Sequence, residues 1–368
     1  MTLPLSRTNA RPESAFSRFW DDFQQAEQQA KSIHHHECHR LDMQGIRVLV
    51  TSIGQGLAHI LLPALGHLVV QPPTEITADV SFTLCDTAIT AIQPPAPPFQ
   101  PADYHRYGQR AVYTDENLSI LHAPTTDMLL AYDRRLRYGI CWVKDAAALS
   151  IYDRAAPLQT HFHWALRDHG WQVVHAAAIG RADGGVLLIG NSGAGKSTTA
   201  FSALKSGRLR YLSDDKCLVR LAPEPATSTL FCSAKIKEDI LDEFPEFRPF
   251  IAGRDDESKV GKHLAFLYPH FRRGMIDSFP LRAIIIPRIR HLQEPALTPA
   301  GAGDAFRVLG PSTAIWLPGA EADSYHFLGQ LVRQLPCYFL DLAFPPHANL
   351  SAIAELLDRY RVFSHPPK

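Results

Sequence analysis

The sequence predicts an α/β protein in which a C-terminal domain with a mixed sheet follows a smaller α+β domain. From Val173 onward the order is strand, loop, helix, strand, which is typical of α/β folds. Upstream, residues 106–145 alternate between apolar and polar positions and are broken by polar turns, a pattern that favours short antiparallel strands. At 368 residues the chain also exceeds the length at which one hydrophobic core keeps growing. We therefore expect two domains, over residues 1–150 and 151–368.

The elements of the first domain follow from hydrophobic periodicity and from breaker residues. Five prolines between residues 92 and 102 exclude a helix or a central strand there and predict a long loop. Gly170 is the stop signal of a helix that precedes the second domain. The predicted helices are Glu13–Ser32, which ends in the His34–His39 cluster of metal-binding residue types, Leu57–Leu65 and Ala156–Asp168; the predicted strands are Ile46–Thr51 and Asp79–Cys85, then a meander of Arg110–Thr114, Leu118–His122, Met128–Tyr132 and Tyr138–Val143.

Composition excludes several classes of protein. Hydrophobic residues make up 46% and charged residues 20% of the chain, the balance of a globular protein. Basic and acidic residues both number 37, so the formal net charge is zero and no basic excess points to nucleic acid. No apolar stretch is long enough to span a bilayer, and no secretory signal is visible. The six cysteines form no C-x-x-C pair and read as reduced thiols. The expected location is the cytoplasm, with no membrane partner.

A glycine-rich loop carries the strongest signal for chemistry. The apolar run Gly185–Ile189 leads into Gly190–Ser197, which matches G-x-x-x-x-G-K-[ST], and Thr198–Leu204 can continue as a helix closed by Gly207. Glycines let consecutive backbone N–H groups turn inward around a phosphate, and the helix N-terminus adds positive potential there. The motif predicts an ATP site in which Lys196 reaches the β- and γ-phosphates and Ser197 ligates Mg²⁺. The nucleotide-binding residues are predicted to be Gly190, Asn191, Ser192, Gly193, Ala194, Gly195, Lys196, Ser197 and Thr198.

Two adjacent carboxylates end the next predicted strand. Asp214 and Asp215 follow Tyr211–Ser213, and Asp214 lies 18 residues after Lys196. Next to a triphosphate, one carboxylate can help to hold Mg²⁺ and the other can take the proton from an attacking hydroxyl. The alternative is an ordinary Asp-Asp turn after a strand. His175 opens the strand before the glycine loop, where a buried structural imidazole is the alternative to a catalytic one.

Together these segments resemble the catalytic domain of HPr kinase/phosphorylase. The same core occurs in phosphoenolpyruvate carboxykinases and in HPr-kinase-like enzymes that tailor peptides. The clear match covers residues 173–221. It implies a P-loop domain with a mixed sheet in which the strands of the P-loop and of the Asp-Asp pair are adjacent. It also implies that Asp214 is the catalytic base, that Asp215 ligates Mg²⁺, and that His175 supports the catalytic aspartate. The predicted catalytic residues are therefore Asp214, His175 and Lys196. Residues 231–239 do not match the glycine-rich signature of HPr kinases, so the resemblance does not extend to HPr as the substrate.

The expected function is ATP-dependent phosphorylation of a hydroxyl, most readily a serine or threonine of a peptide or protein. A small-molecule kinase uses the same residues, and a non-catalytic ATP sensor is the alternative from another class. Oligomers are possible. Further basic side chains could converge on the phosphates, or each could be an ordinary surface charge: Lys235, Lys237, Lys259, Lys262, Arg272, Arg273 and Arg288. Glu238 is a further candidate metal ligand. Residues 255–259 could form a lid. The remaining predicted elements are the strands Thr229–Ser233, Ala283–Ile286 and Cys337–Leu342 and the helices Asp323–Gln334 and Leu350–Tyr360.

Overall fold

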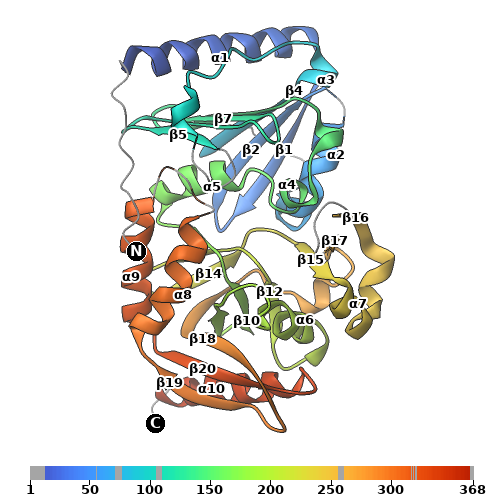
Figure 1. Cartoon of the computed structure of the whole chain (residues 1–368), viewed down its shortest axis with the longest axis vertical. Helices are drawn as coiled ribbons and strands as arrows, with labels where there is room; N and C mark the ends of the chain where they lie inside the picture. Colours follow the sequence, from blue (N-terminus) through green and yellow to red (C-terminus); the bar gives the residue numbers. More distant parts are fainter. Residues whose placement is uncertain are drawn as a thin grey trace.

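The computed structural model describes residues 13–54, 56–70, 77–104, 110–255, 261–315, 317, 319 and 321–364. Over these residues the chain is an α/β protein with two large sheets and one small one. Figure 1 shows the first large sheet in the upper half, under helix α1, and the second in the lower half. None of the helices among the described residues combines the length and the apolar character needed to cross a bilayer.

The first sheet has eight strands in the order β3-β1-β2-β4-β8-β7-β6-β5. Strands β5 to β8 form the predicted antiparallel meander, while β2 pairs with β4, and β4 with β8, in parallel. The strands are β1 (His36–Met43), β2 (Ile46–Ile53), β3 (Val69–Val70), β4 (Val80–Asp86), β5 (Ala111–Thr114), β6 (Leu118–Ala123), β7 (Met128–Asp133) and β8 (Tyr138–Val143).

Helices cover both faces of this sheet. The amphipathic helix α1 (Glu13–Ile33) buries Phe19 and Phe23 against one face, where Trp142 of β8 also lies. The other face packs on α5 (Gln159–Leu166) and on α2 (Leu57–Leu61) with its 3₁₀ continuation Leu62–Leu68. Because successive strand residues point to opposite faces, strands β2 and β4 to β8 contribute to both cores.

Three predictions for this half need correction. The His34–His39 cluster does not end the first helix but opens strand β1, a strand whose first residues are half-exposed, so its apolar alternation is weak. The helix predicted over Ala156–Asp168 is shorter: α4 (Ile151–Ala155) and α5 are separated by a turn at residues 156–158. The helix predicted over Leu57–Leu65 changes to 3₁₀ geometry at Leu62, just before Pro63, whose missing N–H cannot continue the helical ladder. The proline-rich segment is irregular, as expected, apart from short turns.

The second sheet is mixed and has nine strands. Seven follow the order β12-β10-β11-β18-β14-β13-β9, and β20 extends the sheet from β18 and carries β19. The long strand β18 pairs in parallel with β11 and β20 and antiparallel with β14. The strands are β9 (Gln172–Val174), β10 (Ala177–Arg181), β11 (Gly184–Leu188), β12 (Arg210–Ser213), β13 (Cys217–Arg220), β14 (Ala226–Thr229), β18 (Ser278–Leu292), β19 (Ala296–Ala300) and β20 (Cys337–Ala343).

The strand of the glycine loop and the strand of the Asp-Asp pair are not adjacent, contrary to the prediction. Strand β10 lies between β11 and β12 and is antiparallel to both. The reason is that β10 and β11 form a tight hairpin, so β12 can pair only with the free side of β10. Two antiparallel steps make β11 and β12 parallel, and their carboxyl ends therefore meet at one edge of the sheet. The amino end of β10, which follows His175, lies at the same edge.

Helices again cover both faces of the second sheet. On one face α6 (Lys196–Ser206) and α10 (Ala348–Ser364) pack on β10, β11 and β18. On the other face α8 (Ala302–Ala314) and α9 (Glu321–Gln334) bury Leu309 and Leu328. The helices α9 and α10 and the strand β20 were predicted within a few residues. Helix α8 was not predicted, because Gly303, Gly310 and Pro311 interrupt its apolar pattern.

A three-stranded sheet of β15 (Ser233–Lys237), β16 (Ile251–Arg254) and β17 (Lys262–Phe266) flanks the carboxyl edge of the large sheet, with α7 (Glu238–Glu243) beside it. The strand predicted over Thr229–Ser233 is wrong: residues 230–232 connect β14 to β15. They are buried, so their apolar character reflects packing and not a strand. The domain division near residue 150 remains a prediction, since one hydrophobic cluster includes Phe82 from the first sheet together with Trp171 and Leu218 from the second half.

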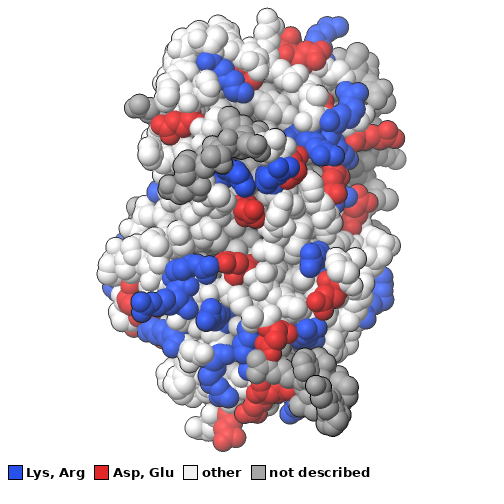
Figure 2. All heavy atoms as spheres, turned by 180° about the vertical axis from the view of Figure 1, so that it is seen from behind, with Lys and Arg blue, Asp and Glu red and all other residues white. Residues whose placement is uncertain are grey.

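The surface carries both signs of charge. Figure 2 shows Lys and Arg side chains beside Asp and Glu side chains in both the upper and the lower half of the face seen from behind. This mixture is what a zero formal net charge leads one to expect. The face in Figure 2 therefore does not present a continuous surface of one sign.

Candidate functional site

The glycine loop joins the end of β11 to the first residue of α6. Gly193 and Gly195 adopt positive φ angles of 83° and 92°, a region that residues with a Cβ atom rarely enter. Helix α6 starts at Lys196 and ends before Gly207, which has a φ of 64° and caps it in the left-handed conformation. The strand, loop and helix expected around Gly190–Ser197 are therefore present, and the free N–H groups of the first turn of α6 lie at the loop.

Lys196 lies at the first position of α6 and is nearly buried. Its ammonium group donates to the carbonyl oxygen of Gly190 and, at 3.1 Å, to that of Asn191, both within the loop. Burial lowers the pKa of Lys196, and the carboxylates of Asp215 and Asp214 oppose this shift. The cation is thus held over the loop, with two carboxylates near enough to affect its charge.

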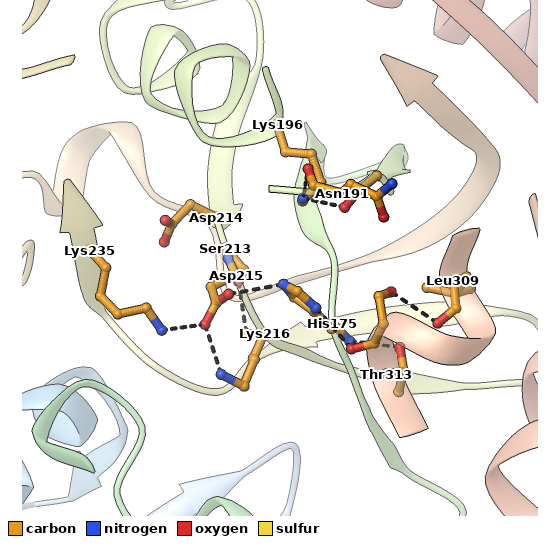
Figure 3. Close-up of polar contacts among 12 residues, drawn as sticks. His175, Asn191, Lys196, Ser213, Asp214, Asp215, Lys216, Lys235, Leu309 and Thr313 are labelled. Carbon is orange, nitrogen blue, oxygen red and sulfur yellow. Dashed lines mark hydrogen bonds and ion pairs between the residues drawn. The ribbon is translucent and has the colours of Figure 1, made fainter. Parts of the chain in front are cut away.

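Asp215 contacts three side chains, two lysines and a histidine. Its Oδ1 lies 3.1 Å from Nε2 of His175, and its Oδ2 accepts from Lys216 at 2.8 Å and from Lys235 at 2.7 Å (Figure 3). Burial alone raises the pKa of this carboxyl group, but Lys216, Lys235 and His175 outweigh it and hold the pKa well below its usual range. Asp215 is therefore an ionised carboxylate over the whole physiological pH range.

Two acceptors hold the His175 side chain between helix α8 and Asp215. Its Nδ1 lies 3.0 Å from the carbonyl oxygen of Ser312, and its Nε2 lies 3.1 Å from Oδ1 of Asp215. Its own backbone N–H donates to Thr313 Oγ1 at 3.2 Å, which fixes it further.

Asp214 has a different environment from its neighbour. Its side chain is buried, and Oδ1 accepts a hydrogen bond of 2.9 Å from the Tyr211 hydroxyl. Burial, and then the charge of Asp215, raise the pKa of Asp214 to about 6. The resemblance implied that His175 supports the catalytic aspartate, taken as Asp214; in the structure His175 contacts Asp215 instead. The topology explains this, because the side chains of consecutive residues diverge and only Asp215 points along the sheet edge toward His175 (Figure 3).

These groups line one cavity of about 460 Å³. It lies between the carboxyl edge of the second sheet and the face of the first sheet that is not covered by α1. Its size falls within the range of small-molecule sites. The wall includes the predicted nucleotide-binding residues Ser192–Thr198, both aspartates and His175, together with Lys216, Lys235, Lys237 and Lys262.

The candidate ligands for a divalent metal are Asp215 and Ser197. Within the described ranges no three His, Cys, Asp or Glu residues group into a metal centre, and this includes the His34–His39 segment. Mg²⁺ usually takes one or two protein oxygens and fills its other positions with phosphate and water. An ionised carboxylate offers about four acceptor positions, and His175, Lys216 and Lys235 use three of those on Asp215, so one remains. The residues present therefore fit a phosphate-bound Mg²⁺.

The weaker candidates from the sequence divide into two groups. Lys235, Lys237 and Lys262 line the cavity, and the Lys235 side chain is only 11% exposed. Glu238 instead pairs with Arg248 and His263 at 2.9 and 2.7 Å. Arg288 makes a two-pronged contact with Asp341, and Arg272 pairs with Asp277. Arg273 lies in a short 3₁₀ turn, and none of Glu238, Arg272, Arg273 and Arg288 lines the cavity. Lys259 and most of the lid predicted over residues 255–259 lie outside the described residues; Asp255 accepts from Tyr152 at 2.8 Å.

Sequence reasoning missed Lys216 and the contacts from helix α8. Lys216 follows the Asp-Asp pair directly and is 8% exposed on its side chain, and burial lowers its pKa to about 8. Its position in the sequence could have drawn attention, because a lysine next to two aspartates and before an apolar strand can turn inward to pair with one of them. The Ser312 carbonyl had no such signal, since a backbone contact across 137 residues leaves no pattern in the sequence.

Comparisons with known proteins add little to this geometry. No family model matches the sequence, and no curated protein matches it either. Among solved structures, the HPr(Ser) kinase/phosphatase from Coxiella burnetii matches 52% of this chain and 98% of its own, with a TM-score of 0.28 and 12% sequence identity. This is a distant structural relationship. A likeness of this extent supports no inference about activity or substrate, so the proposal below is based on the residues of this chain.

Proposed function

We propose that the chain is an ATP-dependent kinase that transfers the γ-phosphoryl group to a hydroxyl. The observation that carries the proposal is the division of the Asp-Asp pair: one carboxylate with a raised pKa and one whose pKa Lys216, Lys235 and His175 hold low, both on the cavity that the glycine loop lines. Pairs of titratable groups whose pKa values are driven apart are typical of acid–base sites. A sensor that only binds ATP has no use for such a division.

In the proposed reaction Asp214 is the general base. It accepts the proton of the acceptor hydroxyl as the oxygen forms a bond to the γ-phosphorus, and the bond from that phosphorus to the bridging oxygen of ADP breaks. A pKa of about 6 suits this role at neutral pH, because the carboxylate is ionised before the reaction and basic enough to take a proton. Asp215 is a weaker base, since Lys216, Lys235 and His175 stabilise its charge.

The lysines that line the cavity would bind the phosphates of ATP. Lys196 and the free N–H groups of the loop would hold the β- and γ-phosphates, and Lys235 would neutralise charge on the transferring group. Asp215 keeps Lys235 and Lys216 in place on the cavity wall. Ser197 and the remaining acceptor position of Asp215 would hold Mg²⁺, which supplies charge neutralisation on the phosphates. Asp215 thus serves as an organiser of cations as well as the metal ligand first expected.

Gly195 gives a test of the nucleotide site. A Cβ atom at this position would lie 2.3 Å from Leu342 Cδ1, and its φ of 92° is unfavourable for alanine. We expect Gly195→Ala to weaken Mg·ATP binding at least tenfold in calorimetric titration. Gly207→Ala, at the other end of the same helix, is the matched control: it also has positive φ, but a Cβ there would meet no atom within 4 Å. It should lose about 1 kcal/mol of stability and keep its ATP affinity. Equal ATP affinities in the two variants would contradict a nucleotide site at the loop.

The function itself is tested by labelling. Purified protein is incubated with Mg²⁺, γ-labelled ATP and a cell extract separated into protein, peptide and metabolite fractions. We expect a labelled acceptor with the wild type and at least tenfold less label with Lys196→Ala. Lys205→Ala, on an exposed position of the same helix, should label like the wild type. Tight ATP binding without transfer to any fraction would leave the ATP sensor as the function.

The acceptor is proposed to be a serine or threonine of a peptide or protein, with a small-molecule alcohol as the second candidate. The second candidate is favoured by one observation, namely that the cavity is walled by both sheets and is no larger than a ligand site. Size fractionation of the labelled extract decides between the two.

A further inference from the structure

Three exposed apolar side chains lie together beside the glycine loop. Among the residues that the structure describes, seven large apolar side chains are strongly exposed, and three of them are Ile289 at 52%, Leu292 at 39% and Phe344 at 76%. All three lie at the end of the ribbon formed by β18 and β20, where the backbone N–H of Phe344 donates to the Leu292 carbonyl at 3.4 Å. Single exposed apolar residues are common on protein surfaces, but a group of them in one place marks a binding surface.

The ribbon of β18 and β20 extends past the start of the glycine loop. Strand β18 stops pairing with β11 at Ile285 but continues beside β20 to Leu292. Leu342 of β20 packs on the loop, because a Cβ atom on Gly195 would lie 2.3 Å from Leu342 Cδ1. Ile289 is the register partner of Leu342, so the two side chains lie on the same face of the ribbon. The exposed apolar group therefore begins directly beside the loop.

The cavity joins this apolar group to the two aspartates across the loop. Ile289 lines the same cavity as loop residues 192–198, Asp214 and Asp215. In the sheet, β12 with the aspartates lies on one side of β11, beyond β10, whereas β18 and β20 lie on the other side. A triphosphate that is held by the loop with its γ-phosphate toward Asp214 therefore directs its α-phosphate toward β18 and β20. The sugar and base of a nucleotide are attached at that end.

We propose that Ile289, Leu292 and Phe344 form the subsite for the purine base of the nucleotide. The inference rests on the nucleotide site of the proposed function and not on phosphoryl transfer. The backbone of a glycine loop contacts phosphates, which all nucleotides share, so selection of the base needs a surface outside the loop. Bases stack on aromatic rings, and their flat apolar faces pack on aliphatic side chains. A purine covers more of such a surface than a pyrimidine, so ATP should bind more tightly than CTP.

The position of the ribbon favours the base over a second copy of the chain, the other occupant that an exposed apolar surface could have. Ile289 borders the space that the loop residues also line, so the surface is continuous with the phosphate site. The contact between Leu342 and Gly195 fixes the ribbon to the loop and sets its distance from the phosphates. A subsite for one part of a bound molecule requires such rigid placement relative to the rest.

The test compares two probes that share the phosphates and differ in the base. Full-length protein with Mg²⁺ is titrated by calorimetry with ATP and with inorganic tripolyphosphate. Phe344→Ala should weaken ATP binding about 5- to 150-fold, the usual effect of removing an aromatic stacking partner from a base. Its affinity for tripolyphosphate should equal that of the wild type. Ile289→Thr, which keeps the β-branched shape that suits a strand, should also weaken the binding of ATP and not of tripolyphosphate.

Leu136→Ala is the matched control for these variants. Leu136 is 57% exposed, which is close to the exposure of Ile289, but it lies in the turn between β7 and β8 of the first sheet and does not line the cavity. Truncation there removes a similar amount of exposed apolar surface. Both affinities should equal those of the wild type.

The outcomes separate the base subsite from the kinase proposal. Equal losses of affinity for ATP and tripolyphosphate in Phe344→Ala, or unchanged ATP affinity in both Phe344→Ala and Ile289→Thr, would overturn the subsite, while phosphoryl transfer would leave the kinase proposal intact. Wild-type protein that binds neither probe would overturn both. Sedimentation at the titration concentrations identifies the other occupant: self-association that Phe344→Ala abolishes, with ATP affinity unchanged, would assign the surface to an interface between copies and overturn the subsite.

Discussion

Asp214→Asn should lower the rate of phosphoryl transfer by roughly 10²–10⁴-fold, the usual contribution of a general base. Mg·ATP affinity should stay within about threefold of the wild type, because Asp214 takes no part in holding the phosphates in this account. The amide keeps the volume of the side chain and can still accept from Tyr211. Single-turnover rates at saturating ATP measure the effect.

The same substitution should make the protein more stable at neutral pH. The folded-state pKa of Asp214 is about 6, above the value of about 3.9 in an unfolded chain. Below pH 4 the group is protonated in both states, and as pH rises through 6 the folded protein must ionise a buried carboxyl at a cost on the order of 2–3 kcal/mol. The neutral amide of the Asp214→Asn variant does not ionise, so the variant avoids this cost. Urea unfolding should therefore show a higher free energy of unfolding for Asp214→Asn than for the wild type at pH 7.5. This gain in stability should vanish near pH 4. Asp183→Asn, in the β10–β11 turn at the opposite edge of the sheet, should show neither the rate loss nor the gain. A variant that is destabilised at pH 7.5 would contradict the assigned environment.

Asp215→Asn should have the opposite effect on stability, a loss of about 3–5 kcal/mol. Its carboxylate compensates Lys216 and Lys235, whose side chains are 8% and 11% exposed, and it also contacts Nε2 of His175. Removing one partner of a buried ionic group leaves the others uncompensated, which accounts for a loss of this size. Since the folded-state pKa of Asp215 is lowered, its contribution is fully present above the unfolded-state pKa of about 3.9. It disappears only as pH falls through the lowered value.

A double-mutant cycle separates this effect from simple loss of packing. Lys235→Met in the Asp215→Asn background removes one uncompensated charge and should restore part of the stability. Asp341→Asn is a matched control: its carboxylate contacts Arg288 in two hydrogen bonds, but the arginine is 31% exposed, and the loss should be nearer 1 kcal/mol. Equal losses of unfolding free energy in Asp215→Asn and Asp341→Asn, or no coupling between Asp215 and Lys235, would contradict the claim that Asp215 compensates buried charges.

Much of the site followed from local sequence pattern. The glycine loop and helix α6 were predictable because strand, turn and helix signals lie within 25 residues of one another and agree. The meander β5–β8 was equally local. Asp214 and Asp215 were found because they follow a strand end, where side chains of parallel strands gather.

The rest depended on contacts across long stretches of chain. Which aspartate His175 would contact depended on β10 lying between β11 and β12, and a hairpin register of this kind is not written in the spacing of the motifs. Lys235 could not be distinguished from a surface lysine, because its inward direction comes from strand β15, which was not predicted.

The most direct test of the central claim is the fate of the γ-phosphate in a single turnover. Wild-type protein is loaded with substoichiometric γ-labelled ATP and Mg²⁺, mixed with the acceptor found by the labelling experiment, and quenched at intervals from milliseconds to minutes. The account predicts that the label leaves ATP and appears as a phosphate ester on an acceptor hydroxyl, at a rate that falls at least 10²-fold in Asp214→Asn while both proteins bind the ATP. ATP that stays bound and intact, label that appears only as inorganic phosphate, or equal transfer rates in the two proteins would contradict it.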